Sequence, residues 1–287
     1  METPSWQVNL MKNDMSRFPI FPTLLTLGNA LCGLGAIRLA SQALGQESYQ
    51  LNLYNAGLLI YLGILFDMLD GRVAIWTKQT SEFGKQLDSL CDVITFGVSP
   101  VFMMLVFSRQ LPMVDPRFFL GIAAIFTLCA ILRLARFNVE SSEDTSLVIF
   151  HGLPTPAAAG LIAAFAIAMP KVLEIKSTPA LEPLGTTLLN VIFFAVPIGT
   201  LVISYLMVSR ISYPHVIKQL VQAPKVSSVR SFYLVVQITF AIVIALTLHE
   251  LALPILFIYY IFGPPMLAVT RRVTARLRLR RHTSPAL

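Results

Sequence analysis

Eight apolar stretches of membrane-spanning length run through this chain of 287 residues. A helix that crosses the hydrocarbon core of a bilayer needs about 20 predominantly apolar residues. The stretches lie at about 18–40, 51–69, 88–108, 117–138, 154–170, 186–208, 231–248 and 251–269. With 55% hydrophobic and 13% charged residues and a mean hydropathy of +0.71, the chain is too apolar for a soluble domain of this length. The sequence therefore predicts an all-α fold, a polytopic bundle of about eight transmembrane helices. A re-entrant hairpin is the alternative for the last two stretches, which only a very short turn separates.

The distribution of lysine and arginine predicts the orientation of this bundle. If both termini are cytoplasmic, 17 of the 22 basic residues lie inside, and the opposite orientation inverts that ratio. The positive-inside rule therefore favours cytoplasmic termini. We expect an integral protein of the cytoplasmic membrane. The formal net charge of +7 is concentrated in cytoplasmic loops and in the tail after Thr270, so we expect anionic lipid headgroups, and no nucleic acid, as its partner.

Four aspartates lie at the ends of two neighbouring apolar stretches. Carboxylates beside bilayer hydrocarbon are costly unless they are paired or solvated, so such a cluster indicates a functional site. The i,i+3 and i,i+4 spacings place the acids on one face of each of two helices. Two divalent cations would neutralise four carboxylates, and Mg²⁺ and Mn²⁺ prefer oxygen ligands. The sequence predicts a two-metal site, at the cytoplasmic membrane boundary, made by Asp67, Asp70, Asp88 and Asp92.

The residues around the acids predict the local helix boundaries. No helix breaker precedes Asp70, so the second helix should continue into the cytoplasm with both of its acids. Ser81 is a good N-cap and Glu82 suits a first turn, which predicts a new helix that begins just before Gly84. The amides and the dipole at that helix start would favour a phosphate group. Gly71 and Gly84 fit positions where a side chain would collide with a ligand or with the other helix, and packing is the alternative for each.

The spacing of these residues resembles the signature of the CDP-alcohol phosphatidyltransferase family. The chain has Asp67-x-x-Asp70-Gly71-x-x-Ala74, nine residues, and then Gly84-x-x-x-Asp88-x-x-x-Asp92. The family pattern has arginine after the alanine, where this chain has Ile75. Two further segments, LRLARFN (132–138) and FHGLPTPAAAG (150–160), resemble the integral-membrane phosphatidylserine synthases of that family.

The resemblance implies a six-helix catalytic core, here residues 1–210, with residues 211–287 forming a C-terminal pair of helices and a basic tail. It also implies a homodimer that uses two divalent cations to transfer the phosphatidyl group of CDP-diacylglycerol to a small alcohol, releasing CMP. Asp88 and Asp92 would be catalytic, with Asp92 partly a metal ligand and also the general base. Nucleotide or phosphate contacts would come from Gly71, Arg72, Ala74, Gly84 and Lys85, with Arg72 a possible substitute for the missing arginine.

The acceptor alcohol is predicted from the end of the fourth stretch. Arg133 and Arg136 lie one helical turn apart and could bind a carboxylate or a lipid phosphate, with Asn138 as a further polar contact. The alternative is a pair of topology anchors, and the resemblance favours L-serine binding. The same chemistry with glycerol 3-phosphate or an inositol phosphate stays open. A metal-ion or proton-coupled transporter is the alternative from another class, but its acids would lie near the bilayer midplane, usually with an internal repeat.

Overall fold

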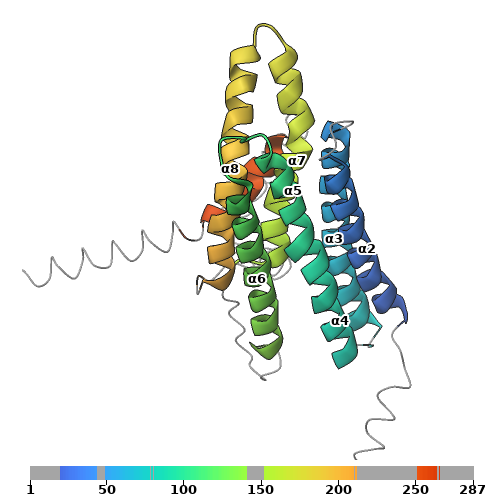
Figure 1. The fold of residues 1–287 in the computed structure, drawn as a ribbon. Helices are drawn as coiled ribbons and strands as arrows, with labels where there is room; N and C mark the ends of the chain where they lie inside the picture. Colours follow the sequence, from blue (N-terminus) through green and yellow to red (C-terminus); the bar gives the residue numbers. More distant parts are fainter. Residues whose placement is uncertain are drawn as a thin grey trace, which may run out of the picture.

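The computed structural model describes residues 20–43, 49–77, 79, 81–140, 152–209, 211, 251–263 and 265. The regular structure of this part is helical throughout (Figure 1). Its elements are α2 (Ile20–Ala43), α3 (Tyr49–Trp76), α4 (Glu82–Asp92), the π-helical segment η1 (Val93–Val98), α5 (Ser99–Ser108), α6 (Pro116–Glu140), α7 (Thr155–Ser177) and α8 (Glu182–Val208). A further helix runs from Leu251 to Gly263.

Five of the described helical segments are long and apolar enough to cross a membrane. The first is α2. The second is the continuous segment Glu82–Ser108, which comprises α4, η1 and α5, and the other three are α6, α7 and α8. The second expected span is α3, a helix that carries two of the aspartates and is not one of these five. The stretch 231–248 lies outside the described residues, and in the last stretch the structure describes the helix 251–263 and residue 265. The all-α membrane fold is confirmed, whereas eight spans, a six-helix core and cytoplasmic termini stay predictions.

The helices stand side by side in one bundle, with α7 near its centre. α3 packs against both α2 and α7, and α8 packs against α6 and α7. Most side chains of the first four turns of α7 are buried, whereas the outer faces of α2 and α6 expose apolar side chains such as Leu31 and Phe118. The α7–α8 hairpin extends beyond the other helices at the upper end of Figure 1. Apolar outer faces of this kind are what a lipid environment requires.

Two glycines allow α2 and α3 to approach η1 closely. A Cβ atom on Gly33 would lie 2.6 Å from Thr95 Oγ1 and 2.7 Å from Thr95 Cα, and a Cβ atom on Gly63 would lie 2.7 Å from Thr95 Cγ2. The hydroxyls of η1 and α5 bond to the backbone of α2: Thr95 donates to the carbonyl of Asn29 at 2.9 Å, and Ser99 donates to that of Gly33 at 2.8 Å. Small residues and interhelical hydroxyl bonds are typical of helix contacts in membranes. These contacts fix the position of η1, and therefore of Asp92 directly before it.

We expect Gly33→Ala to destabilise the protein, because the added methyl group would collide with the backbone of η1. Overpacking of this kind costs about 1–3 kcal/mol. Thermal unfolding of the detergent-solubilised protein measures the effect. Gly121→Ala on α6 is the matched control, since a Cβ atom there meets nothing within 4 Å. Equal melting temperatures for the two variants would contradict the close contact.

Candidate functional site

α3 ends and α4 begins at the same end of the bundle (Figure 1), and carboxylates from both helices converge there. Asp67, Asp70 and Asp88 each offer an oxygen atom, and these atoms lie within 4.8 Å of one another. Asp92, one turn further along α4 than Asp88, is 6% exposed, and Asp70 is 5% exposed. The helix spacing predicts this convergence, and the acids lie at helix ends and not at the middle of the bundle.

The backbone around the acids has the predicted boundaries and one unexpected feature. α3 continues through both of its acids to Trp76, and Ser81 caps α4, accepting a hydrogen bond from the amide of Gly84 at 3.0 Å. Both local predictions are confirmed. Directly after Asp92 the helix changes to π geometry at Val93 and keeps it to Val98. Such π-helical turns occur frequently at functional sites, and hydrophobic periodicity did not reveal this one.

The three clustered carboxylates fit a divalent cation. Asp70 Oδ2 and Asp88 Oδ1 are both buried and have no hydrogen-bond partner. Buried charged oxygens without a partner carry a large desolvation cost, and a bound cation would remove it. Carboxylate oxygens are also the ligands that Mg²⁺ and Mn²⁺ prefer. The residues that would hold such an ion are therefore Asp67, Asp70 and Asp88, with Asp92 beside them.

Asp92 receives a hydrogen bond from α2, a helix on which the sequence analysis placed no site residue. Asn29 Nδ2 donates to Asp92 Oδ1 at 2.9 Å, and the Asn29 side chain is fully buried. The signal in the sequence was a lone amide in an apolar stretch. In a membrane helix such a residue indicates either an interhelical contact or a site.

The two arginines of α6 have different surroundings. Arg133 Nη1 donates to the buried hydroxyl of Thr155 at 3.0 Å, and its guanidinium carbon lies 5.5 Å from the centroid of the Phe137 ring. The carboxylates of Asp92 and Asp67 attract its charge. Arg136 Nη1 instead lies 3.5 Å from the carbonyl oxygen of Val208, at the end of α8. The structure therefore brings one of the two predicted acceptor arginines toward the acids.

Asn138 contacts α4 through a residue that sequence reasoning missed. Its Nδ2 atom donates to Ser89 Oγ at 2.8 Å, and Ser89 lies between Asp88 and Asp92 in the sequence. This bond ties the end of α6 to the acid-bearing helix. In the sequence, the position of Ser89 between Asp88 and Asp92 could have indicated that it lies beside the site.

The three residues of α3 that are predicted to bind the nucleotide or a phosphate have different surroundings. A Cβ atom on Gly71 would meet nothing within 4 Å, so no protein contact explains that glycine. Ala74 lies one turn after Asp70, on the acidic face and partly buried. Arg72 is exposed and, at about 100° per residue, lies on the other side of the helix, so the geometry favours its assigned contact least. Ile75, at the position of the family arginine, is 72% exposed.

Two residues on α4, Gly84 and Lys85, are predicted to bind the nucleotide or a phosphate. Lys85 is partly exposed and lies three residues before Asp88 and seven before Asp92, which places it on their face of the helix. A Cβ atom on Gly84 would lie 3.2 Å from Ser81 Oγ. Gly84 therefore has a local role in the helix cap beside any contact with a ligand.

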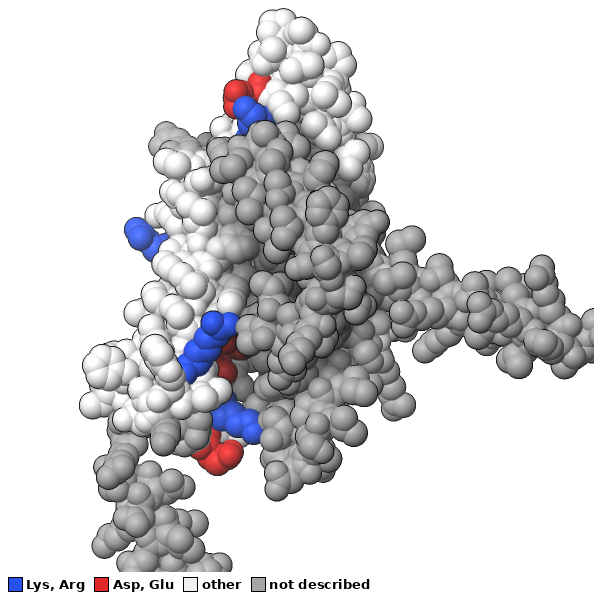
Figure 2. All heavy atoms as spheres, turned by 180° about the vertical axis from the view of Figure 1, so that it is seen from behind, with Lys and Arg blue, Asp and Glu red and all other residues white. Residues whose placement is uncertain are grey.

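Charged groups of both signs gather at this end of the molecule. Figure 2 shows acidic and basic side chains close together near the lower end of the described surface, a second such group near its upper end, and few charges between the two. This arrangement suits a site that binds charged groups at the edge of a membrane.

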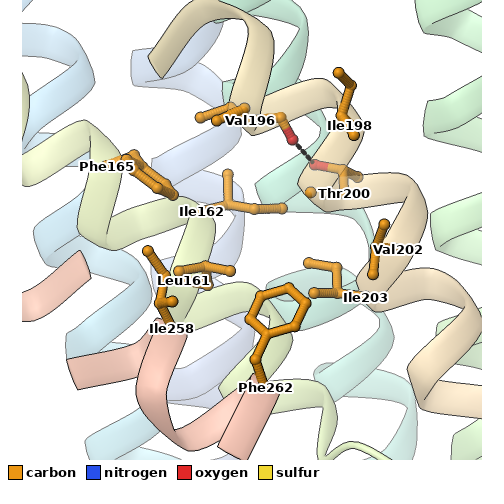
Figure 3. Close-up of a pocket in the computed structure, with 12 residues that line it drawn as sticks. Leu161, Ile162, Phe165, Val196, Ile198, Thr200, Val202, Ile203, Ile258 and Phe262 are labelled. Carbon is orange, nitrogen blue, oxygen red and sulfur yellow. Dashed lines mark hydrogen bonds between the residues drawn. The ribbon is translucent and has the colours of Figure 1, made fainter. Parts of the chain in front are cut away.

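A separate cavity of about 270 Å³ lies between α7, α8 and the helix 251–263 (Figure 3). The hydroxyl of Thr200, a polar group in its lining, donates to the carbonyl of Val196 at 2.7 Å. The lining suits hydrocarbon and none of it comes from α3 or α4, so the cavity is not part of the acidic site. Its residues are Leu161, Ile162, Phe165, Ala195, Val196, Ile198, Gly199, Thr200, Val202, Ile203, Ile258 and Phe262.

Comparisons with known proteins agree with the geometry. Residues 19–204 match the family model described as CDP-alcohol phosphatidyltransferase. The chain is 34% identical over 196 residues to a CDP-diacylglycerol–serine O-phosphatidyltransferase of Bacillus subtilis, an alignment that covers 68% of this chain and 89% of that protein. It is 43% identical over 114 residues to a protein of the same name from Methanocaldococcus jannaschii, covering 39% of this chain and 51% of that one. An archaetidylserine synthase of Methanothermobacter thermautotrophicus is 39% identical over 160 residues, covering 54% and 62%.

We expect the purified protein to bind Mn²⁺, and Asp70→Asn to weaken that binding. Loss of one charge-assisted contact costs about 1.5–3 kcal/mol, or roughly a tenfold to hundredfold change in affinity. Electron paramagnetic resonance of free Mn²⁺ during a titration measures the affinity directly. Glu174→Gln is the control, because Glu174 forms an exposed ion pair with Lys171 on α7. Equal Mn²⁺ affinity of the Asp70 variant and the wild-type protein would exclude Asp70 as a ligand.

Proposed function

Since the chain belongs to the CDP-alcohol phosphatidyltransferase family, we propose that it transfers the phosphatidyl group of CDP-diacylglycerol to L-serine, giving phosphatidylserine and CMP. The observation that carries the proposal is the cluster of three carboxylates with two buried, unpartnered oxygens. Such a cluster suits the cation-assisted displacement of a pyrophosphate. Serine as the acceptor is supported by the names of the relatives and by the position of Arg133 beside the acids.

The acids have two roles in this proposal. Asp67, Asp70 and Asp88, with a part from Asp92, would hold two divalent cations, Mg²⁺ or Mn²⁺. The cations would supply neutralising charge to the phosphate oxygens of the donor. On the protein side, Lys85 and the first turn of α4 would bind phosphate, with Gly71, Ala74 and Gly84 leaving room for the nucleotide. The exposed Arg72 would make at most a peripheral contact.

Asp92 would accept the proton of the serine hydroxyl. The oxygen of serine forms a bond to the phosphorus of the phosphatidyl group, the bond between that phosphorus and the oxygen of CMP breaks, and CMP leaves. An ordinary carboxylate is a weak base for an alcohol, so its placement and desolvation must contribute. Asp92 is nearly buried and has one oxygen fixed by Asn29, which suits a positioned base.

Arg133 would bind the carboxylate of serine. Its bond to Thr155 and its contact with Phe137 fix the guanidinium, and the planar group matches a carboxylate. Arg136 and Asn138 complete the proposed acceptor region, but their contacts with Val208 and Ser89 favour a role in holding neighbouring helices together.

The cellular setting is also part of the proposal. We place the protein in the cytoplasmic membrane with its active site at the cytoplasmic face, since lysine and arginine are concentrated in the loops at that end. Residues 1–210 would form the catalytic core of a homodimer, and residues 211–287 an appended region. The donor headgroup would enter beside the charged side chains near the lower end of Figure 2.

The experiment that tests the function is an assay of CMP release. The purified protein is incubated with CDP-diacylglycerol and, in turn, L-serine, glycerol 3-phosphate or an inositol phosphate, with and without Mg²⁺ or Mn²⁺. We expect release that needs serine and a cation. Release with another acceptor and not with serine would support phosphatidyl transfer but contradict L-serine as the acceptor. No release with any acceptor would overturn the transferase, and the transporter alternative has no support among the relatives.

We expect Asp92→Asn and Asp88→Asn each to lower kcat at least about a hundredfold, because each removes a charge at a base or metal position. CMP release measures kcat, and circular dichroism in detergent reports whether the variants fold. Asp115→Asn is the control, since Asp115 is exposed in the loop before α6 and accepts a hydrogen bond from the amide of Arg117. Near-normal turnover by either site variant would remove that residue from the mechanism.

We expect Arg133→Gln to raise the KM for serine by roughly tenfold to hundredfold, because a charge-assisted contact with a carboxylate is lost. The KM for CDP-diacylglycerol should change much less. Arg136→Gln should have the smaller effect on serine, since its guanidinium is directed to the end of α8. If Arg133→Gln weakens only the lipid substrate, Arg133 binds a lipid phosphate instead of serine.

A further inference from the structure

We propose that Asn29 is a positioning residue for the reaction, holding Asp92 in the orientation that catalysis requires. The inference rests on the proposed function and extends it to α2, on which the sequence analysis placed no site residue. Asn29 Nδ2 donates to Asp92 Oδ1 at 2.9 Å, across 63 residues of sequence.

The surroundings of Asn29 hold its amide in one place. Its side chain is fully buried, and its own backbone carbonyl accepts the hydroxyl of Thr95 at 2.9 Å. A Cβ atom on Gly63 would lie 3.0 Å from Asn29 Oδ1, so α3 forms the wall on that side. With α3 on one side and η1 on the other, the amide has little room to rotate away from Asp92.

The amide makes a contact that general packing does not explain. Asn29 Oδ1 is buried without a hydrogen-bond partner, a cost that an apolar residue of similar size would avoid. The donor half of the same amide bonds to the one acid that lies outside the three-carboxylate group. The hydrogen bond from Asn29 Nδ2 to Asp92 is therefore the contact that explains an amide at this position.

A neutral donor suits this position better than a cation. It fixes one oxygen of Asp92 by a hydrogen bond and leaves the other oxygen for the substrate hydroxyl. A lysine or arginine there would compete with the bound cations for the same negative charge. Asn29 thus orients Asp92 without neutralising it.

The test measures turnover, substrate affinity and cation binding separately in Asn29→Ala. We expect kcat per folded molecule to fall about tenfold to a hundredfold, the effect of a misplaced catalytic group. The KM values for serine and CDP-diacylglycerol should stay within roughly twofold, the pattern of a contact made in the transition state. Mn²⁺ affinity, followed by electron paramagnetic resonance, should also be retained, since Asp67, Asp70 and Asp88 are untouched.

Ser204→Ala is the matched control for the loss of a buried polar group. Ser204 is fully buried on α8, donates to the carbonyl of Thr200 at 2.6 Å and is remote from the acids in the sequence. We expect it to alter thermal stability only. If Asn29→Ala does not fold, Asn29→Asp preserves the volume and replaces the donor with an oxygen. That variant should lower kcat at least as much, without weakening Mn²⁺ binding.

Two results would overturn the inference while leaving the proposed function intact. One is a wild-type kcat per folded molecule in the Asn29 variants. The other is a loss of Mn²⁺ affinity as large as that of Asp70→Asn, which would make Asn29 an organiser of the cation site. If the wild-type protein releases no CMP with any acceptor, the proposed function fails first and the inference fails with it.

Discussion

Repulsion among buried carboxylates is the constraint on which the rest of this structure depends. Three carboxylates with oxygens within 4.8 Å of one another, in largely apolar surroundings, are stable as anions only with compensating charge or hydrogen bonds. The positive charge of Arg133 compensates in part for Asp67, and Asn29 donates a hydrogen bond to Asp92, the acid beside these three. The unpartnered oxygens of Asp70 and Asp88 are the part that the fold leaves to bound cations. A bound cation would remove the cost of these two buried oxygens.

Helix packing converts this local constraint into a bundle architecture. α2 contacts η1 through Gly33, and this contact sets the position of Asp92. Thr155, at the start of α7, accepts a hydrogen bond from Arg133 of α6. The two segments that resemble phosphatidylserine synthases, 132–138 and 150–160, therefore meet in one contact. The helix 251–263 lies beyond the family match, yet Phe257 packs 5.9 Å from the ring of Tyr61 on α3. Residues outside the matched region therefore also pack against it.

The membrane fold and the acidic helix faces follow from local properties of the chain. Apolar length predicted the spanning segments, and a capping serine predicted where α4 begins. Both predictions depend on residues within a few helical turns of one another, so local sequence patterns are sufficient to make them. The last two apolar stretches stay predictions: 231–248 lies outside the described residues, and of 251–269 the structure describes the helix 251–263 and residue 265.

The sequence by itself therefore determined a helical membrane protein with carboxylates on two neighbouring helix faces, because hydropathy and helical periodicity are short-range. Only the tertiary structure decided which side chains meet around the acids. It pairs Asn29 with Asp92 across 63 residues, joins Arg133 to Thr155 and Arg136 to the carbonyl of Val208, and introduces π geometry directly after Asp92. These features depend on how closely distant helices approach and rotate against one another, and no periodicity within a single segment encodes that.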